Sequence, residues 1–295
     1  ERSLDLLLVN GTPSAKPEDR DSFFAELAFA PSDGKPPWVK ARRVDAAELK
    51  PADFQTASAA VLCNVFTLSP DVTLTLKEFV GAGNGLLISC GPNATPESFQ
   101  ACFAESGLLP LLQILRTREA PPQAEQIVRV APLSLHAGWL DRFHSDPARS
   151  FLNATFHAWC LTRIGQSAIP SQAADDVPTP DIHPRQPLFG TAVTNSDGTG
   201  VSATSVPVVL ASLTTGDPLL LESRCGDGLV LTMTSTLNRS WNDLATRSDF
   251  VPFLYEAVFH LGSSRSHRNV SSGEPLIARP GRKVIPNAHA ESDRS

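Results

Sequence analysis

Apolar residues along this chain gather in short runs that are separated by turn signals. Three of the runs are apolar at nearly every position and do not alternate, which is typical of strands covered on both faces of a sheet. They span residues 4–9, 59–65 and 86–88. A fourth run, residues 38–44, alternates between apolar and polar positions, so we expect a strand nearer the edge of the sheet. Together the four runs predict a sheet with a buried centre.

Helical patterns separate these strands. The clearest covers residues 70–80, where Ser69 suits the N-cap, Pro70 suits the first helical position, and the apolar residues share one face. The glycines of segment 81–85 can adopt positive φ and end this helix. Further helical patterns cover residues 21–29, 96–112 and 250–261. Strands that alternate with helices predict an α/β domain with a mostly parallel sheet and helices on both faces.

The last third of the chain predicts an antiparallel addition to this sheet. Apolar runs that favour strands cover residues 208–213, 218–224 and 229–235. The segment Gly226-Asp-Gly228 between the last two runs is a hairpin turn signal. We therefore expect a late antiparallel hairpin at the edge of the parallel sheet or within it.

Residues 113–205 carry a weaker pattern, and we predict an irregular insertion there. Within it, residues 165–187 are rich in Pro, Ser, Ala and Asp, so we expect them to be exposed. From Gly262 the chain is polar. These shifts predict one α/β domain over residues 1–262, followed over 263–295 by a linker or the start of another domain.

The composition limits the possible partners of this chain. Hydrophobic residues make up 41% and charged residues 19%, as in globular proteins. A net charge of −6 opposes broad binding to phosphate backbones, so we expect no nucleic-acid partner. No apolar run approaches the roughly 20 residues of a membrane-spanning helix. The five cysteines form no CxxC pair, which favours buried free thiols over a disulfide framework.

The carboxyl ends of the predicted strands carry small and polar residues. In open α/β sheets, ligands bind in the crevice beyond these ends. The candidates for such a crevice are Asn10, Gly11, Asn64, Cys90, Gly91, Asn238, Trp241 and Asn242. Trp241 could anchor a partner, or it could pack over the sheet end while Asn242 caps the backbone. A single aromatic is not a patch, which favours packing.

Metal and cofactor chemistry find little support in the sequence. Possible metal ligands lie in one region, at His136, His144, Asp146, His157 and Cys160. Their spacings match no standard zinc pattern. The glycines of segment 81–85 precede a strand, whereas a dinucleotide-binding loop follows its strand and opens a helix. We therefore predict no metal and no cofactor.

Several short motifs occur in an order that resembles a known domain. They are Asp5-Leu-Leu-Leu-Val-Asn-Gly-Thr-Pro13, Ser22-Phe-Phe24, Val61-Leu-Cys-Asn-Val65, Leu68-Ser69, Gly83-Asn-Gly-Leu-Leu-Ile88, Gly216-Asp-Pro-Leu-Leu-Leu-Glu222, Gly228-Leu-Val-Leu231, Trp241-Asn-Asp-Leu244 and Phe250-Val-Pro-Phe-Leu254. The chain resembles the class I glutamine-amidotransferase-like module of large bacterial membrane proteins, such as aerotolerance-regulator-type proteins, which often also carry a von Willebrand factor A domain. The resemblance covers about residues 4–262, with 113–205 poorly matched.

The resemblance implies a flavodoxin-like sheet and no established catalysis. Catalytic class I amidotransferases place a cysteine nucleophile on a strand-to-helix elbow and a histidine and a glutamate after a late strand. Cys90 corresponds approximately to that nucleophile, but Pro92 removes one backbone N–H from the elbow. Residues 235–239, which follow the late strand, contain neither histidine nor glutamate. A base could then come only from His136 or His157, and a thiol without a base is largely protonated at neutral pH.

We therefore predict a pseudoenzyme, that is, a non-catalytic interaction or scaffold module of a larger bacterial membrane-anchored protein. Its membrane association would come from segments absent from this sequence, and its partners would be proteins or neighbouring domains of the same chain. The alternative is a thiol-dependent amidotransferase or hydrolase that uses Cys90 as its nucleophile. The missing histidine after the late strand favours the first interpretation.

Overall fold

The structure, a computed structural model, describes residues 3–30, 37–121, 127–143, 151–165 and 206–263. Two of the predicted segments fall outside these ranges. They are the exposed insertion of residues 165–187, apart from Gly165, and the terminal linker of residues 263–295, apart from Ser263.

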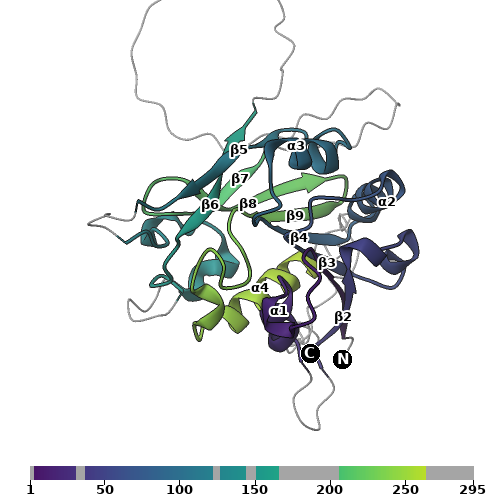
Figure 1. Cartoon of the computed structure of the whole chain (residues 1–295), viewed down its shortest axis with the longest axis horizontal. Coiled ribbons are helices and arrows are strands. Elements are labelled where there is room, and N and C mark those ends of the chain that lie inside the picture. The colour runs from purple at the N-terminus through teal and green to yellow at the C-terminus, as the bar shows by residue number, and fades with distance from the viewer. Residues whose placement is uncertain (1–2, 31–36, 122–126, 144–150, 166–205, 264–295) are drawn as a thin grey trace, which may run out of the picture.

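A seven-stranded sheet forms the centre of the described part of the chain, in the order β2-β1-β3-β4-β9-β8-β7 (Figure 1). Its strands are β1 (Leu4–Asn10), β2 (Val39–Asp45), β3 (Ala59–Cys63), β4 (Gly85–Ser89), β7 (Val208–Ser212), β8 (Pro218–Cys225) and β9 (Gly228–Met233). The pairs from β2 through β9 are parallel, and β8 and β7 continue the sheet in antiparallel pairs. The predicted mostly parallel α/β sheet with a late antiparallel hairpin is confirmed.

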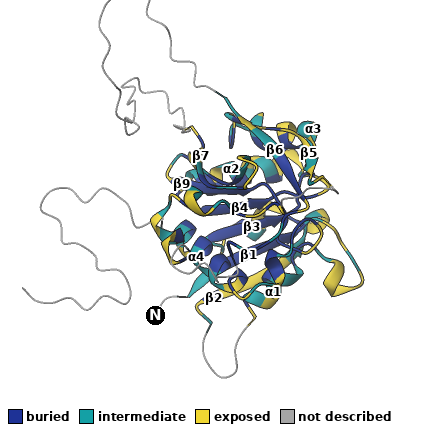
Figure 2. Cartoon of the chain, turned by 90° about the vertical axis from the view of Figure 1, so that its left-hand side faces the viewer, coloured by how far each residue is buried: buried dark blue, intermediate teal, exposed yellow. Residues whose placement is uncertain are grey.

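Burial follows the hydrophobic pattern of the strands. Every position of β3 and β4 is buried, as expected for apolar runs without alternation (Figure 2). In the edge strand β2, residues 40–43 are exposed and carry most of the charge, which protects an edge from pairing with another chain. The sheet therefore has its most protected strands at its centre.

Helices cover both faces of the sheet and bury two apolar clusters there. Helices α1 (Phe23–Ala28) and α4 (Phe250–Gly262) contribute to one cluster, and α2 (Pro70–Gly81) and α3 (Pro96–Phe99) contribute to the other. The Ser69 hydroxyl accepts a hydrogen bond from Val72 N, and Gly83 adopts a φ of 95° just after α2. Short 3₁₀ turns lie at Pro17–Asp19, Ala46–Glu48, Pro51–Phe54, Pro132–Ser134, Gly138–Phe143 and Leu244–Thr246.

The predicted helix of residues 96–112 is too long. Helix α3 is followed by a π-helical turn at Gln100–Ala104, and the chain then turns into a strand. Gly107, which has a φ of 76°, lies between the π-helical turn and this strand. Positive φ is incompatible with a continuing right-handed helix, so the helical pattern ends before residue 107.

Residues 112–164 contain regular structure that the sequence pattern did not indicate. Strands β5 (Leu112–Glu119) and β6 (Ala158–Ile164) pair as a separate antiparallel ribbon. The ribbon lies beside β8 of the main sheet, which β6 contacts (Figure 1). The described part of the insertion is thus more ordered than the predicted irregular segment. Within the described ranges, no helix is both long and apolar enough to cross a membrane.

Candidate functional site

The carboxyl ends of four parallel strands are aligned at one edge of the sheet. The register pairs Asn10 of β1 with Cys63 of β3, Cys63 with Ser89 of β4, and Ser89 with Met233 of β9. The residues that follow these ends therefore meet, and they include most of the predicted crevice candidates. This alignment follows from the parallel pairing, since parallel strands end at the same edge.

Asn64 occupies the centre of this edge. It adopts a φ of 55°, and its side-chain Oδ1 accepts a hydrogen bond of 3.0 Å from Asn93 N. Gly11 and Gly91 lie so close that a Cβ atom would stand 2.1 Å from the Asn64 carbonyl oxygen at Gly11 and 2.5 Å from the Asn64 side chain at Gly91. The close approach of Asn64 is therefore sufficient to require glycine at both candidate positions.

Asp21 is the residue on which the polar groups of this edge converge. Its Oδ2 accepts a hydrogen bond of 3.1 Å from Asn64 Nδ2, and its Oδ1 accepts one of 2.8 Å from Asn238 Nδ2. Asp21 is buried, and this burial raises the pKa of its carboxyl group against the opposing effect of hydrogen bonds from Thr12, Asn64 and Asn238. The carboxylate thus joins the loop after β1, the end of β3 and the loop after β9.

Asp21 is not among the residues predicted from the sequence to line the crevice. The hydrophobic pattern places it at the start of the helix over residues 21–29, but α1 begins at Phe23, and Asp21 lies in the preceding turn. An acidic residue before a helix usually indicates an N-cap. Nothing in the local pattern signals its pairing with Asn238, which is 217 positions away.

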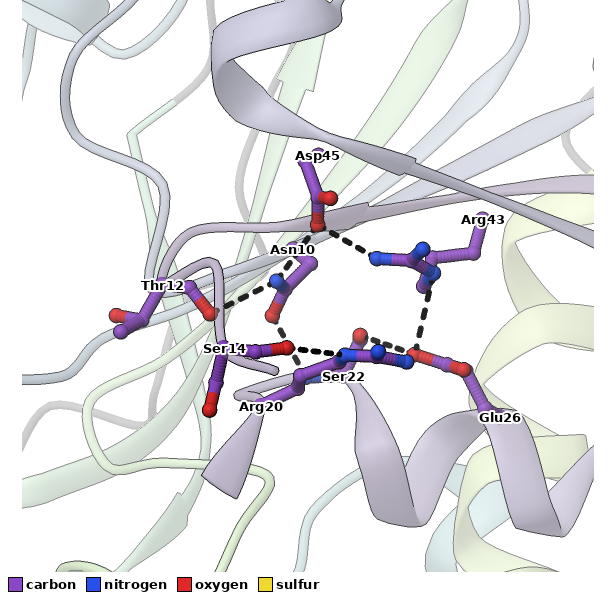
Figure 3. Close-up of polar contacts among 8 residues, drawn as sticks. All are labelled: Asn10, Thr12, Ser14, Arg20, Ser22, Glu26, Arg43 and Asp45. Carbon is purple, nitrogen blue, oxygen red and sulfur yellow. Dashed lines mark hydrogen bonds and ion pairs between the residues drawn. The ribbon is translucent and has the colours of Figure 1, made fainter. Parts of the chain in front are cut away.

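Asn10 anchors a second polar cluster beside the first (Figure 3). Its Nδ2 donates to Asp45 Oδ1 at 2.8 Å and to the Thr12 carbonyl at 2.9 Å, and its Oδ1 accepts from Ser22 N at 3.3 Å. The hydrogen bond from Asn10 lowers the pKa of Asp45, and the guanidinium of Arg43 acts in the same direction. The polar atoms of Asn10 are thus occupied by neighbours within the chain.

The loop after β9 packs inward. Asn242 Nδ2 donates to Thr236 O at 2.8 Å and to Ser235 Oγ at 3.0 Å. The Trp241 side chain is buried, and its carbonyl oxygen accepts from His157 N at 2.7 Å. Of the two interpretations of Trp241, the structure agrees with packing over the sheet end.

Cys90 follows β4 and is fully buried, at 0% exposed surface. Its backbone N donates to Met233 O at 2.9 Å. The neighbouring Cys160 thiol of β6 and burial together raise the pKa of Cys90 well above its usual range. His136 and His157, the suggested bases, both have exposed side chains. Across the described ranges, no imidazole hydrogen-bonds the Cys90 sulfur.

No metal centre is formed by the described side chains, since no three His, Cys, Asp or Glu residues among them are placed to hold an ion. His144 and Asp146 of the possible ligand set lie outside the described ranges. Two open hollows of the described surface lie away from the carboxyl ends of the strands. One, of about 420 Å³, adjoins Leu74 and Cys102, and the other, of about 170 Å³, adjoins Lys40 and Arg42.

Comparisons with known proteins add a fold but no family. No protein-family model matches the chain, and no curated protein matches it. Two solved structures from Salmonella typhimurium are similar: cytoplasmic protein STM1381 of strain LT2, with 12% identity, a TM-score of 0.52 and coverage of 90% of this chain and 100% of that one; and cytoplasmic protein STM3548, with 11% identity, a TM-score of 0.50 and coverage of 88% and 98%. A ThuA-like protein from Parabacteroides merdae ATCC 43184 has 11% identity, a TM-score of 0.45 and coverage of 93% and 95%.

At these identities the likeness concerns the fold alone. The matches cover 90% and 88% of this chain and nearly all of the two Salmonella proteins, so the likeness extends over most of the chain. The activity of this chain must therefore be inferred from its own residues.

Proposed function

We propose that this chain is a non-catalytic interaction module with a class I glutamine-amidotransferase-like, flavodoxin-like fold, and that it serves a larger bacterial membrane-anchored protein. Its partners would be other proteins or neighbouring domains of the same polypeptide. The order of short motifs along the sequence supports the fold and the setting. The burial of Cys90 and the mutual hydrogen bonding of the polar side chains at the carboxyl ends of the strands support a non-catalytic role.

The burial and pairing of Cys90 carry the proposal. An amidotransferase nucleophile must be a thiolate within reach of both a substrate and a base. Cys90 has 0% exposed surface, and its burial and the neighbouring Cys160 thiol raise its pKa rather than lower it. Burial keeps substrate away from the sulfur, and the raised pKa reduces the thiolate fraction at neutral pH.

The polar groups around Cys90 point to the same conclusion. Asn10, Asn64, Asn238 and Asn242 donate to partners within the chain, and Asp21 receives two of these hydrogen bonds. A ligand crevice needs polar groups that are directed at the ligand. The groups at this edge are instead directed at one another, which rigidifies the position where related folds bind ligands.

An activity assay tests the catalytic half of this proposal. Release of ammonia from glutamine and hydrolysis of an activated thioester are measured for the wild type, Cys90→Ala and Cys63→Ala. Cys63 is a matched control because it is also buried and its thiol pKa is also raised, chiefly by burial. We expect the three proteins to be indistinguishable from buffer. A wild-type rate that survives Cys63→Ala and disappears in Cys90→Ala would establish the thiol enzyme instead.

The interaction half is tested by cross-linking mass spectrometry on the full-length protein in its membrane. Lys40 and Lys50 are exposed on the β2 side of the sheet and can report contacts there. We expect cross-links from this module to other domains or to a second polypeptide. Cross-links confined to residues of this domain would contradict an interaction role.

A further inference from the structure

Strand β2 is an open edge of the main sheet. Within the described ranges it pairs with β1 alone, so its outer backbone N–H and C=O groups have no partner strand there (Figure 2). The opposite edge strand, β7, is covered, because the carbonyls of Leu210 and Ser212 accept hydrogen bonds from the amides of His136 and Ala131 at 3.1 Å and 2.8 Å. An open edge can take up an added strand through its backbone groups.

The exposed side chains of β2 are mainly cationic. Lys40, Arg42 and Arg43 are all exposed, although the chain as a whole has a net charge of −6. Arg42 forms an ion pair with Asp53 at 2.9 Å, and Arg43 forms one with Asp45 at 2.6 Å. Among the described residues, Lys40 has no ion-pair partner. The ammonium group of Lys40 therefore remains available to an external carboxylate.

An exposed tryptophan and a hollow accompany these cations. Trp38, directly before β2, is 68% exposed, and the alternation of the strand places it on the same face as Lys40 and Arg42. A hollow of about 170 Å³ opens beside Lys40 and Arg42 and is lined in part by Leu7 and Ala57. Exposed tryptophans are frequent anchors of interfaces, and a hollow beside a strand can receive a side chain of an added strand.

The charges of β2 exclude a second copy of this chain as the added strand. In every antiparallel register of β2 with itself that forms at least five residue pairs, two cationic side chains stand directly opposite each other. In the fully overlapping register, for example, Arg42 opposes Arg42 of the second copy. Like charges in this position are destabilising, whereas opposite charges are favourable. The same cations that prevent self-pairing therefore favour an acidic strand.

We propose that the outer edge of β2 takes up an extended acidic segment of a partner protein as an added strand of the main sheet. The backbone of β2 would bond the segment, Lys40 would pair with one of its carboxylates, and Trp38 would cover one of its side chains. This inference rests on the proposed interaction role and names its surface and its partner. Cross-linking of the full-length protein tests the role and peptide binding tests the surface, so the two can fail separately.

The experiment titrates the whole chain with a fluorescein-labelled peptide in which glutamate and valine alternate. Fluorescence anisotropy measures binding, and hydrogen exchange locates it. We expect binding that weakens with added salt, and slower amide exchange in residues 39–45 but not in β7. A peptide of alternating glutamate and proline has the same charge but lacks half of the amide donors, so it should neither bind comparably nor slow this exchange.

Charge-reversal variants make the result specific. Lys40→Glu should weaken binding of the glutamate–valine peptide by about tenfold, because a favourable cross-strand pair becomes a repulsive one, and should improve binding of a lysine–valine peptide. Lys16→Glu is the matched control, since Lys16 is exposed in the loop after β1 and its substitution changes the net charge equally. Trp38→Ala should also weaken binding by about tenfold.

Several results would overturn the proposal. They are a glutamate–valine peptide that leaves the exchange of residues 39–45 unchanged at millimolar concentration, equal binding of the glutamate–proline peptide, and equal effects of Lys40→Glu and Lys16→Glu. Dimerisation of the chain that slows exchange of β2 without any peptide would assign the edge to a second copy instead. The comparison of peptides uses the wild type, so a folding failure in a variant leaves the test intact.

Discussion

Asp21 is a buried carboxyl group, and its burial disfavours the ionised form. Ionised groups are costly to bury unless donors surround them. Here the side-chain amides of Asn64 and Asn238 donate to its two oxygens, and Thr12 also bonds the carboxyl group. The burial effect is the larger one, because the pKa of Asp21 is raised. Asp21 thus connects the segments that follow β1, β3 and β9. Its hydrogen bonds offset the effect of burial on its pKa only in part.

Replacing Asp21 with asparagine tests this role. Asp21→Asn turns one acceptor into a donor that faces another donor, so we expect the free energy of unfolding to fall by roughly 1–3 kcal/mol near pH 7. A raised carboxyl pKa contributes stability that is fully present below the unfolded pKa and is lost as the pH rises through the folded pKa. The stability difference between the wild type and the variant should therefore be larger at about pH 4 than at about pH 7. Urea unfolding at the two pH values measures both effects.

The matched control for this prediction is Asp5→Asn. Asp5 is exposed in β1, and a surface substitution of this kind changes stability by less than about 0.5 kcal/mol. The role of Asp21 would be contradicted if its variant were as stable as Asp5→Asn, or if the difference from the wild type became smaller at low pH.

The position of the site residues could be predicted from the sequence, but their side-chain contacts could not. The candidates Asn10, Gly11, Asn64, Cys90 and Gly91 follow predicted strands, and the strand register brings them together. Their position could be predicted because parallel strands end at one edge. The direction of each side chain could not, since the partner of an amide or a thiol is set by distant loops and by the ribbon.

At the scale of elements, Asp217 links the ribbon to the main sheet. Its Oδ2 accepts hydrogen bonds from Arg118 Nη1 at 3.0 Å, from Trp159 Nε1 at 2.9 Å and from Thr215 Oγ1 at 2.8 Å. The guanidinium of Arg118 also lies 5.7 Å from the centre of the Trp159 ring. Arg118 comes from β5, Trp159 from β6, and Asp217 from the turn before β8, so one carboxylate joins three elements.

We expect Asp217→Ala to lower the free energy of unfolding by about 2 kcal/mol, because it leaves the Trp159 N–H and the Arg118 guanidinium without this acceptor. Trp159 is fully buried, so water cannot readily replace the lost bond. Urea unfolding monitored by tryptophan fluorescence measures the change. Asp227→Ala is the control, since Asp227 is an exposed aspartate in the turn after β8 and its loss should cost less than about 0.5 kcal/mol. Equal effects of the two substitutions would contradict the linking role.

The elements differ in how well the sequence predicts them, for a physical reason. Residues 6–9 of β1 and all of β3 and β4 are buried on both faces, and their uninterrupted apolar runs indicate this directly. Strand β5 is partly exposed, and its register shifts between Ile114 and Arg116, which breaks the alternation that would reveal a strand. Its pairing with β6 is long-range, and no local pattern encodes it.

At the scale of the whole molecule, one layer of strands separates two apolar clusters, and the ribbon covers part of the strand-end edge. Cys90 lies where these parts meet: after the central strand β4, against the end of β9, and in contact with β6. In the class I amidotransferases to which our proposal likens this fold, this position would face substrate. Here it faces the chain's own ribbon, and the proposed non-catalytic role depends on that closure.

The rate at which Cys90 is alkylated in the folded, fully reduced protein tests this closure most directly. Iodoacetamide labelling near pH 7 is followed by peptide mass spectrometry, with glutathione as the reference thiol and with the protein unfolded in guanidinium as the accessible control. The account predicts that Cys90 reacts at least about 100-fold more slowly than glutathione in the folded protein and at a similar rate once unfolded, because the thiol is sealed and its pKa is raised. Labelling of folded Cys90 faster than glutathione, with a rate that rises through a pKa below that of an ordinary thiol, would contradict it.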